Sequence, residues 1–230
     1  MKLSLVSLAS LVPLAAAHFK LDYPPSRGFV EDTMPRFPCG GLAQSSNRTV
    51  LSLSEGALPV ALTMGHSQTA VEILLGLGND PGSNFNITLV PTFRLTGLGS
   101  FCLPHVPLDP KVLGTNLTDG ANATLQVVTN GDPTGGLYAC ADITFSRTVA
   151  SDTPTGCKNN TGVSATPFSG AAAARNANES TPDGQPQSGA SASGTSTGTT
   201  APSSTAGAAA LETAAWGVVG AAIVGGLAVL

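Results

Sequence analysis

His18 is the residue whose position most strongly suggests chemistry, because it follows a segment typical of a removable leader. Residues 1–17 combine a lysine near the start, an apolar run over 3–14 and three alanines at 15–17. This is the pattern of a secretory signal peptide with an A-x-A cleavage site. Cleavage after Ala17 would make His18 the first residue of the mature chain. The same alanines also allow cleavage a residue or two earlier, and His18 would then be incidental.

An N-terminal histidine offers a metal ion two nitrogen donors, the α-amine and the imidazole Nδ1, which can close a chelate ring. A second imidazole would complete a T-shaped, three-nitrogen site, and nitrogen-rich tetragonal sites favour Cu(II). His66 lies in a turn between two apolar segments and could supply that imidazole, although its spacing fits a solvated surface histidine equally well. His105 stands between two prolines and could be a rival ligand, although we expect a surface residue there.

The region that must position these histidines, residues 18–168, shows weak helical periodicity. Short β-rich runs dominate it, and clusters of Gly, Asn, Asp and Pro separate them. Such spacing predicts an all-β domain, an antiparallel immunoglobulin/fibronectin-like β-sandwich. The expected strands are 49–53, 59–64, 69–76, 86–93, 123–129 and 137–145.

Cysteines and glycosylation sequons also place this domain outside the cell. An even number of cysteines in a secreted chain predicts two disulfides, with three pairings open, and the absence of C-x-x-C spacing argues against a cysteine zinc site. The cysteines are Cys39, Cys102, Cys140 and Cys157. Sequons for N-glycosylation, which must face solvent when occupied, begin at Asn47, Asn86, Asn116, Asn122, Asn159 and Asn178.

The C-terminal part of the chain changes composition twice. Residues 169–207 are rich in Ser, Thr, Ala and Gly, which predicts a disordered, O-glycosylated stalk. Residues 208–230 form a spacer and an uncharged apolar tail, typical of a GPI-attachment signal removed on anchoring. Small residues that could accept the anchor are Ser203, Ser204 and Gly207. A single membrane helix is the alternative, but the tail is short for one and lacks a basic flank.

Five segments of the domain together resemble the lytic polysaccharide monooxygenases and their relatives. Within that superfamily the chain looks most like the GPI-anchored, LPMO-like copper-binding proteins of fungi, the copper-acquisition-factor family. The resemblance spans essentially the whole domain. The matching segments are 18–29, 38–41, 65–66, 99–104 and 138–145.

This resemblance implies a sandwich of the monooxygenase type and a set of copper ligands. His18 would give its amine and Nδ1, and His66 its imidazole, forming a histidine brace; Asp142 matches the family's aspartate ligand, whereas His105 lies outside the motif. A carboxylate donor favours Cu(II) and occupies space that a co-substrate would need. The implied protein is a GPI-anchored, copper(II)-binding protein of the cell surface or wall, acting in copper uptake or homeostasis and not an enzyme.

Two other functions are compatible with the sequence. One is a copper-dependent lytic polysaccharide monooxygenase acting on a cell-wall polysaccharide, although the domain has no Trp and two Tyr with which to stack sugars. The other is a structural wall glycoprotein. A copper transporter and wall glycans are the partners we consider, and we expect a monomer. The net charge of −4, with no basic patch, argues against nucleic acid.

Overall fold

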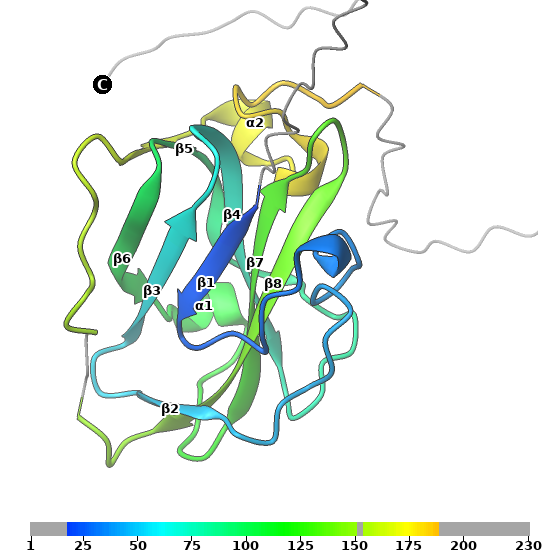
Figure 1. Ribbon diagram of the computed structural model, residues 1–230. Helices are drawn as coiled ribbons and strands as arrows, with labels where there is room; N and C mark the ends of the chain where they lie inside the picture. Colours follow the sequence, from blue (N-terminus) through cyan, green and yellow to red (C-terminus); the bar gives the residue numbers. More distant parts are fainter. Residues whose placement is uncertain (1–17, 151–153, 189–230) are drawn as a thin grey trace, which may run out of the picture. The chain divides into compact units, whose positions relative to one another are not determined.

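The computed structural model describes residues 18–150 and 154–188, which form two packed β-sheets (Figure 1). The small sheet has the strand order β1-β3-β6, with β1 Phe19–Tyr23, β3 Ala57–Met64 and β6 Gly99–Pro107. The large sheet has the order β2-β8-β7-β4-β5-β9, with β2 Thr49–Ser52, β8 Gly136–Ser146, β7 Asn122–Asn130, β4 Gln68–Leu77, β5 Ile87–Thr96 and β9 Ser164–Pro167. The predicted all-β sandwich is confirmed. The leader, the anchor candidates and most of the expected stalk lie outside the described residues.

The core lies between the two sheets and follows from the period-two alternation of each strand. Val71, Ile73 and Leu75 of β4 have no exposed surface and pack with buried residues of β3, such as Val60 and Leu62. All six expected strands are present, and each begins and ends within three residues of its expected bounds. Pairing is antiparallel except between β2 and β8, which run parallel.

Three strands were not expected from the sequence. Two of them, β6 and β9, are edge strands, where proline is tolerated because an edge leaves some backbone N–H groups unpaired. Pro104 lies within β6, so a proline-containing segment that was not expected to be a strand is paired with β3. The third, β1, is also at an edge and carries His18 immediately before its first residue.

A long connection between β1 and β2, residues 24–48, covers one part of the large sheet's outer face. A disulfide between Cys39 and Cys140 fastens this connection to β8, and the Arg27 amide donates to the Cys140 carbonyl at 2.8 Å. The connection also contains the short 3-10 helix η1, Glu31–Thr33. The second disulfide joins Cys102 of β6 to Cys157. The structure thus selects one of the three pairings that the sequence left open.

Residues 169–188, which we call the C-terminal clasp, correct the expected domain boundary. They contain α2, Gly170–Ala173, and the 3-10 helix η2, Ala177–Glu179, and they cover another part of the outer face of the large sheet (Figure 1). Ala177 is fully buried, and the Gln187 side chain both donates to and accepts from the backbone of Gly135. The domain therefore continues past residue 168, because small side chains can pack on an existing sheet without supplying a core of their own.

The clasp also explains why β4 alternates imperfectly. Glu72 points to the outer face yet is buried, and its Oε2 accepts a hydrogen bond from the Ala177 amide at 3.1 Å. The remaining short helix, α1, spans Pro110–Leu113 and begins with an Asp109 cap. Within the described ranges, no helix combines the length and apolar character needed to cross a bilayer.

Burial beneath the clasp makes Glu72 a source of pH-dependent stability. Desolvation raises the pKa of Glu72 from 4.5 to about 7, the Ala177 amide opposes this shift, and the nearby Glu179 adds to it. A raised carboxyl pKa means that the folded protein holds a proton that the unfolded chain releases, so stability falls as pH rises from about 4.5 through 7. The full cost above pH 7 is about 3 kcal/mol.

We expect Glu72→Gln to remove this cost while keeping an acceptor for the Ala177 amide. The variant should therefore gain stability over the natural protein as pH rises from 5 to 8, by up to about 3 kcal/mol at the alkaline end. Urea unfolding at several pH values measures the difference. Glu179→Gln is the matched control, because Glu179 acts on Glu72 only through its charge and should give a much smaller gain. A constant difference between pH 5 and 8 would contradict the assignment.

Candidate metal site

The register of β1 on β3 brings the start of the domain beside the β3–β4 turn. Phe19 pairs with Met64, and the Gly65 amide donates to the His18 carbonyl at 2.9 Å. His66 is the next residue in that turn, so the two histidines that the sequence singled out lie at the same end of the sandwich. Residues 18 and 66 are thus brought together by strand pairing, which fixes their backbones.

The His18 imidazole is held between an acidic and an aromatic side chain. Its Nδ1 lies 2.8 Å from Oε1 of Glu31, and its ring meets the edge of Phe29 with the ring centroids 6.5 Å apart. The geometry of the Glu31 contact is not that of a hydrogen bond, and Nδ1 is buried without a hydrogen-bond partner among the described residues. A buried imidazole nitrogen without a hydrogen bond, 2.8 Å from a carboxylate oxygen, places two possible metal donors side by side.

A backbone contact orients the His66 ring so that Nε2 is the nitrogen available to a metal ion. Its Nδ1 lies 2.7 Å from the Gln68 carbonyl oxygen. A carbonyl can only accept, so the proton sits on Nδ1 and the lone pair of Nε2 is free. Metal-binding histidines commonly donate their second ring nitrogen to a backbone carbonyl in this way. The ring also lines a small cavity of about 180 Å³, together with Asn130, Asp132 and Gln187.

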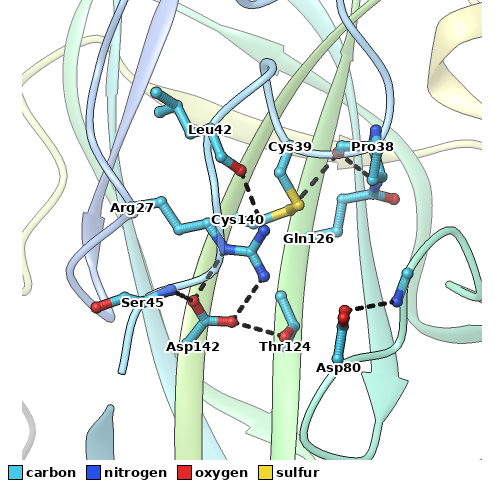
Figure 2. Close-up of a disulfide and its surroundings, with 11 residues drawn as sticks. Arg27, Pro38, Cys39, Leu42, Ser45, Asp80, Thr124, Gln126, Cys140 and Asp142 are labelled. Atoms are coloured by element: carbon cyan, nitrogen blue, oxygen red, sulfur yellow. Dashed lines mark hydrogen bonds and ion pairs between the residues drawn. A yellow bond between two sulfur atoms is a disulfide. The ribbon is translucent and has the colours of Figure 1, made fainter. Parts of the chain in front are cut away.

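Asp142 is not part of this arrangement. Its two oxygens accept from Nε and Nη2 of Arg27 at 2.9 and 2.8 Å, and also from the Ser45 amide and the Thr124 hydroxyl (Figure 2). Gly136 begins β8 at the His66 end of the sheet, and Asp142 lies six residues further along that strand, which is about 20 Å. The structure therefore does not bring Asp142 to the histidines.

The reason lies in the connection between β1 and β2, which sequence patterns cannot place. The side chain of Asp142 has no exposed surface, and that of Arg27 is 8% exposed. Burial alone would raise the pKa of Asp142, but the hydrogen bonds from Arg27, Ser45 and Thr124 hold it below its usual range. This carboxylate is a structural ion pair that ties the connection to β8. The carboxylate that lies beside His18 is that of Glu31, which sequence reasoning missed.

The remaining candidate ligand from the sequence, His105, does not lie beside the histidine pair. His105 lies exposed on the edge strand β6, as expected. No set of three His, Cys, Asp or Glu side chains within 18–150 and 154–188 is grouped closely enough to hold a metal ion. A site at His18 would therefore need a donor from outside these side chains. The amine that cleavage after Ala17 would create is such a donor.

The sequons divide by exposure. Asn47, Asn86, Asn116 and Asn159 are exposed. The other two are partly buried and hydrogen-bonded: Asn122 accepts from the Thr144 hydroxyl, and Asn178 bonds to Tyr138. Exposed side chains meet the requirement for carrying a glycan on the folded domain.

The architecture and the paired histidines define a β-sandwich of the type found in lytic polysaccharide monooxygenases and related copper proteins. The family described as "Copper acquisition factor BIM1-like" matches residues 16–162, and the chain belongs to this family. A copper-related function for the family follows from its description.

Relatives agree with this placement. An uncharacterized protein of Aspergillus fumigatus is 68% identical over the full length of both chains. The lytic polysaccharide monooxygenase-like protein X325 of Yarrowia lipolytica is 34% identical over 74% of this chain and 65% of its own length. Copper acquisition factor BIM1 of Cryptococcus neoformans var. grubii is 33% identical over 61% of this chain and 65% of its own.

Proposed function

We propose that this protein binds copper(II) at the extracellular face of the cell, through a histidine brace, and takes part in copper uptake or homeostasis there. The donors would be the amine and Nδ1 of His18, once the leader is removed, and Nε2 of His66. Copper bound there would be held as Cu(II), which nitrogen donors in a tetragonal arrangement suit. GPI anchoring through the C-terminal signal would keep the site at the plasma membrane or wall.

The proposal rests on two histidine side chains at one end of the sheet: one has a buried nitrogen without a hydrogen bond, and the other is oriented by a backbone carbonyl. Nδ1 of His18 is buried without a hydrogen bond, while Nδ1 of His66 is committed to Gln68. The strand register brings these two imidazoles to the same end of the sheet, where both can serve one metal ion. The family's copper-related description supports the choice of metal.

Glu31 is the carboxylate that lies beside His18, and we propose it for the role that the family resemblance implied for Asp142. Its carboxylate faces Nδ1 of His18 at 2.8 Å and is half exposed. It can act as an additional oxygen donor beside the brace. A hard anionic donor stabilises Cu(II) relative to Cu(I), which favours holding the ion over cycling it through oxidation states.

The test is Cu(II) EPR on the domain secreted with His18 as its first residue. We expect one copper per chain with nitrogen hyperfine structure from the brace. His66→Ala should weaken copper binding by about a hundredfold to ten-thousandfold, since a linked donor set loses one of its members. Glu31→Gln should keep the nitrogen pattern and change the copper hyperfine constant, whereas Asp32→Asn, its neighbour, is the matched control and should change neither.

Absence of stoichiometric copper in correctly processed protein would overturn the proposal. Oxidised sugar ends, formed from a cell-wall polysaccharide at a rate well above that of free Cu(II) when reductant is present, would favour the monooxygenase alternative.

A further inference from the structure

A polar pocket of about 660 Å³ lies in the same molecule at a distance from the histidines. Residues 44–48, which lead into β2, form one wall, and Asn79, Asn122 and Thr144 of the large sheet and its loop form the other. Its volume is typical of small-molecule sites, but these are usually lined by apolar and aromatic side chains. Every side chain that lines this pocket is polar.

The pocket presents neutral groups. Arg48 is its one lining residue with a charge, and Nη1 donates to the carbonyls of Ala123 and Ile143 at 2.9 and 3.2 Å. Nη2 donates to the Asn79 carbonyl. With the guanidinium committed to backbone oxygens, the pocket offers amides and hydroxyls, which match the hydroxyl and acetamido groups of a saccharide better than an ion.

Two of the lining residues begin glycosylation sequons, and they differ in availability. Asn47 is exposed, and its side chain makes no hydrogen bond within the part of the chain that the structure describes. Asn122 is half-buried; its Oδ1 accepts from Thr144 at 2.6 Å, and its Nδ2 contacts Asn79 at 3.4 Å. The free amide nitrogen at the rim of the pocket therefore belongs to Asn47.

We propose that the pocket seats the first sugars of an N-linked glycan on Asn47, so that the glycan is a structural part of the domain. The glycan would start at a residue of the pocket wall, so its effective concentration there is far higher than that of any free saccharide. Gln44 supplies an unused donor, because its Nε2 is buried without a hydrogen-bond partner among the described residues. This nitrogen has no exposed surface, so a sugar oxygen can satisfy it once the Gln44 side chain rotates into the pocket, and an unpaired donor is costly.

The proposal is independent of copper and is tested on protein secreted from a glycosylating host. Glycopeptide mass spectrometry should find Asn47 occupied. Asn47→Gln should then lower the melting temperature by about 2–4 °C. Asn86→Gln is the matched control, because Asn86 is an exposed sequon outside this pocket, and it should leave the melting temperature unchanged.

Gln44→Ala separates a seated glycan from a merely attached one. We expect this variant to lose stability in the glycosylated protein and to lose less, or none, in the Asn47→Gln background. Three results would overturn the proposal: an unoccupied Asn47, equal melting temperatures for Asn47→Gln and Asn86→Gln, or binding of free chitobiose to the Asn47→Gln protein with no loss of stability. The last result would assign the pocket to an external glycan.

Discussion

A short Gly-Ser extension that ends in a protease recognition site cut directly before His18 should lower copper(II) affinity by about a hundredfold to ten-thousandfold, because it takes one tethered donor out of the site. The extension leaves both imidazoles in place and moves only the amine. Isothermal titration with Cu(II), using a competing chelator of known affinity, measures the loss. EPR should show fewer nitrogen donors in the extended protein.

Proteolytic removal of the extension supplies the control. Cleavage that leaves His18 first should restore both the affinity and the EPR signal, which excludes a folding defect as the cause. The His105→Ala variant should bind copper like the natural protein, because His105 lies exposed on the edge strand β6. Equal affinity before and after removal of the extension would contradict the histidine brace, even if copper still bound at the imidazoles.

How far the sequence predicts this structure depends on the range of the interactions involved. Strand β8 could be read directly, because Leu137, Ala139 and Ala141 alternate toward the core, and that period is local. The pairing of His18 with His66 could be anticipated only through the family resemblance. In the structure it rests on the register Phe19–Met64, which joins residues far apart in the chain.

The residues whose surroundings the sequence did not predict depend on covering segments. Asp142 sits on the outer face of β8, where a strand pattern predicts solvent, yet Arg27 and the connection beyond it enclose the carboxylate. Nothing in the sequence marks Glu31, since a single acidic residue in a 3-10 helix of three residues shows no hydrophobic periodicity. The clasp was predicted to be disordered because its composition cannot build a core, but Ala177 needed only the existing surface around Glu72.

Replacing Asp142 should therefore affect folding far more than copper. Asp142→Asn keeps the shape of the side chain but removes the charge that compensates Arg27, and breaking a buried ion pair on one side costs about 3–5 kcal/mol. Chemical denaturation measures the loss near pH 7. Because the pKa of Asp142 is depressed, its contribution in the natural protein is present above about pH 4 and disappears as pH falls through the folded-state pKa.

The paired variant Arg27→Met with Asp142→Leu distinguishes an ion pair from a metal ligand. Removing both charges leaves no unpaired group, so much of the stability lost in Asp142→Asn should return. Such a protein should also bind copper(II) with the affinity and EPR parameters of the natural protein, because His18 and His66 keep their register through β1 and β3. A changed copper signal in a fully folded double variant would restore Asp142 to the coordination sphere. An unchanged one leaves Glu31 as the carboxylate beside the brace.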